Sequence, residues 1–408
     1  MKFTIGSRFS LYTSIFVTIT ITLFLSWSAA KTWLSYVYAT DPPPNGLNDA
    51  IRIESENSQF YFMLGEYYAN YDLSAPRSRV YDLYKKALEL NPLDYNYWYY
   101  LAEFLLQERK RDLAIYTLNK ATELAPGVVS LRWAAGMLAS RLGDEEALIN
   151  NLRAVIAYDR HRRYKAFPIL WQSLRNGDKV REAVPYNALP TYLHFLISTK
   201  RVSEAKAAWE KLSSMGEIPE DIFLRYVSFL ISEKELPTAI NVWTDRLGKW
   251  EGIWNGDFNE KILNAGFDWK LGNVEGAKII ESVDTNDTGR SIKIAFDGNH
   301  NVDFYHLRQL IPVEEETNYK LTSLMKSKDI STRNGLLWQV YCANNKNLHA
   351  ESEQVRGTTD WHPVTVSFTT PKNCSAVVLK LRRYKTDKFS NNFSGILWVD
   401  KVSLEKVQ

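Results

Sequence analysis

The pattern of apolar and polar positions changes along the chain. Residues 9–30 are uncharged and mostly apolar, and residues from about 50 to 250 repeat apolar positions every three or four residues. Beyond about residue 254, apolar and polar positions alternate. A repeat of three to four residues is the period of an amphipathic helix, whereas alternation is typical of a strand with one buried face. The chain is therefore expected to contain an apolar helix, an all-α region and an all-β region, in that order.

The apolar segment predicts a membrane helix. Its 22 uncharged positions, residues 9–30, match the roughly 20 that a helix needs to cross a bilayer. Lys2 and Arg8 precede it and only Lys31 follows closely. The positive-inside rule then places residues 1–8 in the cytoplasm and the bulk of the chain on the extracytoplasmic, periplasmic side. A cleaved signal peptide is the alternative, although its apolar region is usually shorter.

A proline-rich stretch follows the membrane segment. Three consecutive prolines, Pro42 to Pro44, precede Asn45 and Gly46. Proline fixes φ and lacks a backbone N–H, so such a run favours extended chain over helix. Residues 31–50 are therefore predicted to form an extended tether between the membrane and the first folded domain.

The helical region repeats itself. The pentamers HFLIS (194–198) and SFLIS (228–232) begin 34 residues apart. Residues 95–128 alternate large and small residues at the spacing of the tetratricopeptide repeat, a 34-residue helix–turn–helix unit, which the region resembles. The small residues let two helices approach closely and the large ones fill the space between them. The positions that carry the pattern are Trp98, Leu101, Ala102, Leu105, Ala114, Leu118, Ala121 and Pro126.

The resemblance implies an architecture and a type of partner. One helix pair cannot bury its own apolar face, so the pairs of a tetratricopeptide protein stack into a superhelix with a groove. We therefore expect residues 51–250 to form an all-α, tetratricopeptide-like solenoid whose groove holds a protein partner. Such a scaffold carries out no chemistry by itself.

The all-β region, residues 251–408, carries a second set of motifs. It opens on WNGDF (254–258) and GFDW (266–269), contains DWHPVTVSF (360–368), and closes on WVDKVSL (398–404). This order resembles carbohydrate-binding modules with a galactose-binding-like jelly roll. The resemblance implies a β-sandwich, and it implies a glycan ligand less strongly because the shared motifs are structural.

Strand parity separates core side chains from candidate contacts with sugar. Gln339 and Tyr341 alternate with core positions on one strand, and Arg382 and Tyr384 do so on another. Tyrosine rings stack on the C–H faces of sugars, and arginine and glutamine bond paired hydroxyls. These four residues, with Trp269 from a loop, are the predicted glycan contacts. The alternative is that they form a half-solvated outer face with no ligand.

Parity also assigns two further tryptophans. Trp338 alternates with the apolar residues of its strand and is expected in the core. Trp398 stands two residues before Asp400 and on the same parity as Val402 and Leu404, so it is expected there too.

The family resemblance also implies a structural calcium ion. Asp400 occupies the position of the closing aspartate that helps to hold calcium in such modules, and Asp257 lies in the opening motif. Asn259 stands where a glutamate is common, which removes one hard oxygen ligand. The alternative role for Asp400 is to cap a turn. No other cofactor is expected.

The two cysteines, Cys342 and Cys374, both belong to the β region. An exported domain with one such pair suits a single disulfide. Two buried free thiols are the alternative, because the sequence does not give their separation.

Together these features favour a binding protein. A net charge of +3 over 408 residues does not indicate a nucleic-acid partner. No nucleophile elbow, zinc-protease, Walker or dinucleotide-binding motif occurs, so no enzyme is predicted. Anchored tetratricopeptide proteins resemble accessory factors of exopolysaccharide or cell-envelope assembly. The alternatives are a protein–protein adaptor whose sandwich is only a structural cap, and a polysaccharide-active enzyme with an unrecognised site.

Overall fold

The computed structural model describes residues 8–72, 74–284, 289–344, 347–386 and 391–407. By its internal contacts the chain divides into two compact units. The first comprises Met1–Leu196 with Glu204–Leu212, and the second comprises Ile197–Ser203 with Ser213–Gln408. The second unit therefore contains the last helix pair as well as the β region. Residues 1–7, most of the predicted cytoplasmic segment, lie outside the described residues.

The first helix, α1 (Arg8–Ala39), is long and apolar enough over Leu11–Ala39 to cross a membrane. Its most apolar stretch is not buried against the rest of the protein. The hydroxyls of Thr18, Thr20 and Thr22 each donate to the carbonyl four residues earlier, at 2.8–2.9 Å. Because the helix satisfies these three hydroxyls itself, they can lie in hydrocarbon without being left unpaired.

The predicted tether is wrong. Helix α1 continues to Ala39, and α2 (Asn45–Ile53) begins directly after the prolines. The prolines occupy only the turn, where a missing N–H interrupts no helical hydrogen bond. Glu54, at the end of α2, accepts hydrogen bonds from Ser35 at 2.7 Å and Thr32 at 3.2 Å. The segment after the apolar stretch is therefore a folded helical hairpin.

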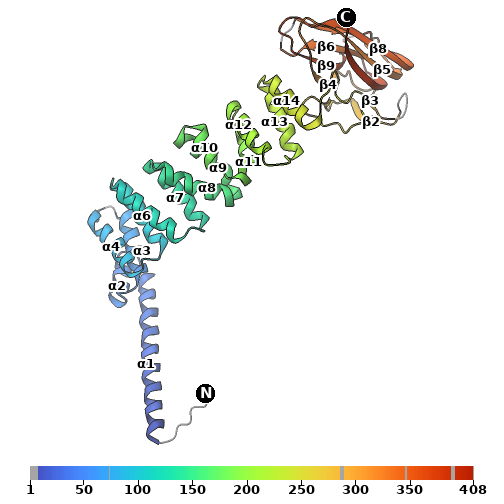
Figure 1. Cartoon of the computed structure of the whole chain (residues 1–408). Coiled ribbons are helices and arrows are strands. Elements are labelled where there is room, and N and C mark those ends of the chain that lie inside the picture. The colour runs from blue at the N-terminus through green and yellow to red at the C-terminus, as the bar shows by residue number, and fades with distance from the viewer. Residues whose placement is uncertain (1–7, 73, 285–288, 345–346, 387–390, 408) are drawn as a thin grey trace. The chain divides into compact units, whose positions relative to one another are not determined.

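Helix pairs follow, as the 34-residue spacing predicts (Figure 1). The pairs in the described residues are α3 (Ser58–Asn70) with α4 (Arg77–Leu90), α5 (Tyr95–Gln107) with α6 (Arg111–Leu124), α7 (Val129–Leu142) with α8 (Glu145–Tyr158), α9 (Arg160–Leu174) with α10 (Gly177–Ala183), α11 (Leu189–Ser198) with α12 (Val202–Ser213), and α13 (Glu220–Ser232) with α14 (Leu236–Leu247). The pentamers HFLIS and SFLIS form the ends of α11 and α13.

Small residues set the approach of the two helices in a pair. Ala102 and Ala121, two of the predicted small positions, are completely buried. Gly65 and Gly136 occupy the corresponding place in α3 and α7, and a Cβ at Gly136 would lie 2.7 Å from a methyl of Leu152. At Gly136 the two helices therefore come closer than a larger residue would permit, whereas a Cβ at Gly65 would make ordinary contact with Tyr84 at 3.4 Å. This packing confirms the tetratricopeptide pattern.

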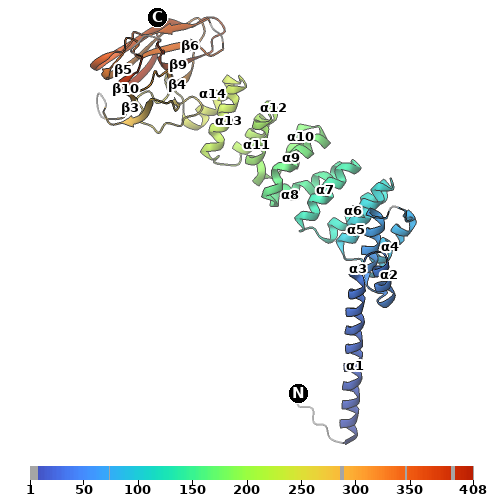
Figure 2. The same cartoon turned by 180° about the vertical axis from the view of Figure 1, so that it is seen from behind.

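Aromatic contacts join successive pairs within the first unit. Phe62 of α3 lies 6.1 Å from Tyr84 of its own pair, and 4.8 Å and 5.2 Å from Tyr97 and Tyr100 of α5, between ring centroids. The first helix of this pair, α3, thus contacts both its partner α4 and the first helix of the next pair, α5. Figure 2 shows the order of the helices from behind. The helices form a stack of hairpins, as a solenoid requires.

The β region is a sandwich of two antiparallel sheets, with strand orders β1-β4-β9-β6-β7 and β2-β3-β10-β5-β8. Their inner faces supply one apolar core, which includes Trp338 as predicted. The strands are β1 (Lys270–Leu271), β2 (Ala277–Ser282), β3 (Ser291–Asp297), β4 (Phe304–Pro312), β5 (Asn318–Ile330), β6 (Leu337–Cys342), β7 (His349–Glu351), β8 (Gly357–Thr369), β9 (Ala376–Arg383) and β10 (Ser394–Lys406).

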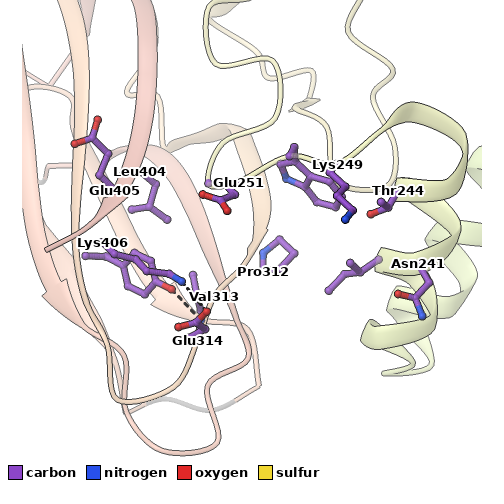
Figure 3. A pocket seen from close by; sticks show the side chains of 14 residues that line it. Asn241, Thr244, Lys249, Glu251, Pro312, Val313, Glu314, Leu404, Glu405 and Lys406 are labelled. Carbon is purple, nitrogen blue, oxygen red and sulfur yellow. Dashed lines mark hydrogen bonds and ion pairs between the residues drawn. The ribbon is translucent and has the colours of Figure 1, made fainter. Parts of the chain in front are cut away.

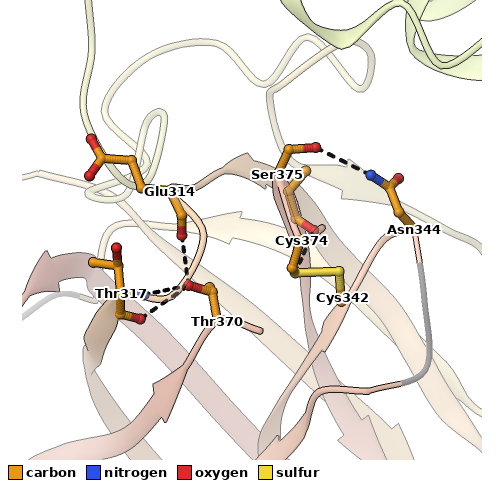
Figure 4. The surroundings of a disulfide bond; sticks show 8 residues. Glu314, Thr317, Cys342, Asn344, Thr370, Cys374 and Ser375 are labelled. Atoms are coloured by element: carbon orange, nitrogen blue, oxygen red, sulfur yellow. Dashed lines mark hydrogen bonds between the residues drawn. A yellow bond between two sulfur atoms is a disulfide. The ribbon is translucent and has the colours of Figure 1, made fainter. Parts of the chain in front are cut away.

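A disulfide links the end of β6 to the turn before β9 (Figure 4). Cys342 and Cys374 have Cα atoms 5.8 Å apart. Beside the bond, Asn344 donates to the hydroxyl of Ser375 at 3.2 Å. The link fixes the ends of two neighbouring strands.

Trp398 is buried, as expected, but it does not lie in the core between the sheets. A register shift on β10 between Asp400 and Ser403 reverses the parity, so Val399 faces the core before it and Val402 after it. Trp398 pairs with Lys293 and Lys326 on the outer face, and their ammonium groups lie 5.3 Å and 5.5 Å from its ring. Simple alternation cannot reveal such a bulge.

The last helix pair packs on the opening segment of the sandwich, within the second unit. The buried Trp243 of α14 lies 5.3 Å from Trp254 and 5.7 Å from Phe267, between ring centroids. Gly266 has a φ of +58°, and a Cβ there would lie 2.3 Å from the Trp243 ring. The opening motif is thus shaped to cover the end of the helix pair.

Gly256 is expected to tolerate no side chain. A Cβ at Gly256 would lie 2.0 Å from the carbonyl oxygen of Val402. The backbone N–H of Val402 in turn donates to the Gly256 carbonyl at 2.8 Å, which holds the two segments together. Gly256→Ala should therefore lower the free energy of unfolding by about 3 kcal/mol, as overpacking against backbone does. Gly127→Ala is the control, because no atom lies within 4 Å of its Cβ. Chemical denaturation of both variants checks this, and equal stabilities would contradict it.

Asp268 should make the second unit more stable at acidic pH. Burial raises the pKa of Asp268 to about 6, although Leu263 and Trp269 donate backbone hydrogen bonds to its carboxylate. Between about pH 4 and 6 the folded state holds a proton that the unfolded state releases, so this contribution to stability falls as pH rises. Relative to Asp268→Asn, the native chain should gain up to about 3 kcal/mol between pH 7 and pH 4. Denaturation of both proteins across that range measures it, and a constant difference would refute it.

Candidate functional site

The predicted glycan contacts from β6 and β9 lie on the outer face of the sheet β1-β4-β9-β6-β7. Gln339 and Tyr341 point to the side opposite the buried Trp338 and Val340, and Arg382 pairs with Leu337 on that side. Tyr384 follows β9 directly and its hydroxyl contacts the Gln339 amide. The structure therefore brings together four of the five residues that the sequence selects. We call this surface the sugar face because it carries the predicted glycan contacts; a glycan ligand is proposed below.

Hydrogen bonds fix the polar groups of the sugar face. The Gln339 amide donates to Glu351 at 2.7 Å, and the Tyr384 hydroxyl donates to the same carboxylate. His349 lies 2.8 Å from the Gln339 amide nitrogen and 3.4 Å from Glu351. Gln339 is only 5% exposed. It holds Tyr384 and Glu351 in place rather than offering its amide to a ligand.

Each tyrosine of the sugar face lies against a cation. The Lys380 ammonium is 4.6 Å from the centroid of Tyr341, and the Arg382 guanidinium is 4.2 Å from that of Tyr384. Arg382 also donates to Asp303, which sets the guanidinium plane. Burial raises the pKa of Tyr384, and so does its bond to Glu351, so its hydroxyl stays protonated at neutral pH. Such fixed rings and donors suit a polyhydroxylated ligand.

A row of polar side chains crosses the whole sheet. The register pairs Lys270 with Arg308, Arg308 with Lys380, Lys380 with Gln339, and Gln339 with Glu351. Directly paired residues point to the same side, so all five share the sugar face. Lys270 and Arg308 were not among the predicted contacts, because the register between strands cannot be seen in the sequence of one strand. The available signal was that both residues are polar and stand at positions that alternate with core positions along their strands.

The positive charges of this row repel one another. Burial lowers the pKa of Lys270, and the neighbouring Arg308 lowers it further. Burial also lowers the pKa of Lys380, and the positive charge of Arg382 lowers it further. His306 has its pKa lowered by burial and then by Arg308, so it stays neutral at neutral pH. The face therefore carries closely spaced positive charge that repels itself.

Trp269 is not a glycan contact. Its side chain is completely buried, lies 5.2 Å from Phe258 and 6.1 Å from Trp338 between ring centroids, and donates to the Asn255 carbonyl at 2.9 Å. The prediction treated the opening segment as an exposed loop. In the structure this segment folds over the core, so the apolar ring is buried.

The aspartates assigned to calcium do not by themselves build a metal site. Asp400 is 2% exposed and accepts a hydrogen bond from the Lys401 N–H at 2.7 Å. Asp257 accepts from the side-chain amide of Asn259 at 2.9 Å. Within the described ranges no group of three acidic, histidine or cysteine side chains is placed to hold a metal. Calcium takes six to eight oxygen ligands. The calcium site therefore stays a prediction.

Apart from the sugar face, the second unit has a hollow between α14 and the edge of the sandwich (Figure 3). Its volume is about 860 Å³, and its lining includes Asn241 and Thr244 from the helix and Tyr319 from β5. Glu314 and Lys406 form an ion pair in it at 2.6 Å. Because these charges balance each other, the hollow is electrostatically less distinctive than the sugar face.

A small pocket in the helical region gathers acidic and aromatic groups. Glu66, Tyr84, Tyr100 and Glu103, from α3, α4 and α5, line a volume of about 120 Å³. Tyr84 donates to Glu66. Burial raises the pKa of Glu66, and the negative charge of Glu103 raises it further. A positive group entering this pocket would relieve that repulsion.

The tetratricopeptide repeat family model matches residues 83–116. No functionally described protein matches the chain significantly in sequence. Residues 83–116, which match the tetratricopeptide model, span the second half of α4, all of α5 and the start of α6.

Solved structures resemble each part separately. A CBM4 module has a TM-score of 0.30 and 17% identity, covering 38% of this chain and 99% of its own. The CBM22-1 xylan-binding domain from Paenibacillus barcinonensis has a TM-score of 0.26 and 12% identity, covering 38% and 92%. A tetratricopeptide repeat protein from Parabacteroides merdae has a TM-score of 0.31 and 13% identity, covering 53% and 91%.

Proposed function

We propose that this protein is a membrane-anchored scaffold that binds a protein partner through its helix pairs and a glycan on the sugar face. Its helix α1 would hold it in the membrane with the bulk on the extracytoplasmic, periplasmic side. Its role would be that of an accessory factor in exopolysaccharide or cell-envelope assembly. The described residues give no positive evidence of catalysis.

The arrangement of Tyr341, Arg382 and Tyr384 carries the glycan part of this proposal. These side chains come from two neighbouring strands and share one partly exposed face. An aromatic ring can stack on the apolar C–H face of a sugar, while guanidinium and hydroxyl groups bond its oxygens. The underlying Gln339–Glu351 network keeps Tyr384 in one orientation, which reduces the entropy that binding must overcome.

The pocket of Glu66 and Glu103 supports the protein-binding part. Stacked helix pairs present extended surfaces that bind peptides or proteins. Here that surface includes two carboxylates, one of them with a raised pKa, among tyrosine rings. A lysine or arginine of the partner would find opposite charge and aromatic faces at the same place.

Removing the two rings should strongly weaken glycan binding. We expect the full-length Tyr341→Ala, Tyr384→Ala double variant in detergent micelles to lose at least about tenfold in affinity, since stacked rings contribute on the order of 1 kcal/mol each. Affinity electrophoresis in gels that contain polysaccharide measures this. Tyr158→Ala is the control, because Tyr158 is 79% exposed at the end of α8. Retained binding in the double variant would contradict the site, and no binding by the native chain would contradict the glycan role.

Neutralising the helical pocket should weaken capture of the protein partner. After cross-linking in native membranes, Glu66→Gln with Glu103→Gln should recover several-fold less partner than the native chain. Glu89→Gln with Glu123→Gln removes the same charge from exposed residues of α4 and α6, which pair with surface lysines, and should have no effect. Quantitative mass spectrometry compares the three samples. Equal recovery from all of them would exclude this pocket as the docking point.

A further inference from the structure

We propose that the sugar face selects an acidic polysaccharide, one whose carboxylates lie along the row of Lys270, Arg308 and Lys380. This inference rests on the proposed glycan-binding function and narrows its ligand class. A neutral glycan on the same face would satisfy that function without satisfying this inference.

The three cations form a straight row on adjacent strands. Lys270 on β1 pairs with Arg308 on β4, which pairs with Lys380 on β9. Neighbouring strands are about 4.8 Å apart, so the row extends over about 10 Å. A polymer with an acidic group on successive sugars could therefore contact more than one cation at once. Simultaneous contacts increase affinity beyond that of any single charge pair.

Protein carboxylates only partly balance these charges: Asp303 and Glu351 raise the pKa of Lys380, but burial and the arginines Arg382 and Arg308 lower it more. Among the described residues, the side chains of Lys270, Arg308 and Lys380 form no ion pair or hydrogen bond with an acidic group. The two acids on this face are already engaged. Asp303 accepts from Arg382, and Glu351 accepts from Gln339 and Tyr384.

The repulsion within the row indicates what would stabilise it. The lowered pKa values of Lys270 and Lys380 both include the effect of a neighbouring arginine. A bound carboxylate would offset that repulsion as well as form its own contacts. The chain as a whole has a net charge of only +3, so this positive charge is local rather than a consequence of composition.

The neighbouring aromatic rings favour a sugar over other polyanions. Lys380 lies against Tyr341, so a ring stacked on the tyrosine would place its substituents beside the ammonium. Arg382 and Tyr384 repeat this arrangement two residues along β9. A nucleic acid or an anionic lipid surface could use the charges, but the fixed Tyr384–Glu351 hydrogen bond offers oxygens suited to sugar hydroxyls.

The test compares acidic polymers with their uncharged counterparts. The full-length protein in detergent micelles is titrated with polygalacturonate, alginate and hyaluronan, and with the same polymers after their carboxyl groups are reduced to hydroxymethyl groups. EDTA is present throughout, so that calcium cannot bridge the polymers. We expect at least one acidic polymer to bind about tenfold or more tightly than its reduced form at low salt, with the difference shrinking as salt rises.

Matched variants locate the effect. Arg308→Gln with Lys380→Gln should lose most of the preference for the acidic polymer over its reduced form. Lys320→Gln with Lys328→Gln removes the same charge from exposed positions of β5 on the other sheet, and should keep the preference. An equal loss in both double variants would mean that net charge alone is responsible, which overturns the inference.

The remaining outcomes distinguish the two levels of the proposal. Equal affinity for acidic and reduced polymers would overturn the inference while the glycan-binding function stands. Absence of binding to every polymer would overturn both. A single-stranded DNA oligomer and vesicles of anionic phospholipid serve as rival probes. Tighter binding to either, unaffected by Tyr341→Ala with Tyr384→Ala, would assign the face to that ligand instead.

Discussion

A helix pair of the length found here cannot cover its own apolar flanks, so every pair needs a neighbour or a cap. In the first unit the neighbour is the next pair, and Phe62 in contact with α4 and α5 is an example. In the second unit the α13–α14 pair is covered by the opening segment of the sandwich through Trp243, Trp254 and Phe267. The absence of a side chain at Gly266 makes that contact possible. The sandwich is thus a structural cap as well as a domain with surfaces of its own.

The same burial requirement explains where a ligand can bind. Two sheets pack their apolar faces together, which leaves polar residues on the outer faces. On the sugar face the register collects Lys270, Arg308 and Lys380 from strands far apart in sequence. Charges that repel one another at this distance reduce stability unless something binds them. Such an arrangement is therefore better explained by an anionic ligand than by the needs of the fold.

Sequence periodicity predicted more of the fold than of the site. The helix pairs followed from small residues such as Ala102 and Ala121, and the core position of Trp338 followed from alternation. Trp398 was assigned to the wrong face because a bulge reverses parity on β10, and Trp269 was misassigned because the opening segment folds over the core. Lys270 and Arg308 were missed because register is a property of two strands together. The proline turn was misread because local stiffness does not reveal the helices packed around it.

Oxidative footprinting of the full-length protein, with and without a saturating polysaccharide that it retains, tests the central claim most directly. Hydroxyl radicals modify accessible tyrosine and tryptophan side chains, so a ligand on the sugar face should protect Tyr341 and Tyr384. Tyr158, at the end of α8, should be modified equally in both samples. Protection of Trp250 in the hollow beside α14, with Tyr341 and Tyr384 unchanged, would contradict the account and place the ligand elsewhere.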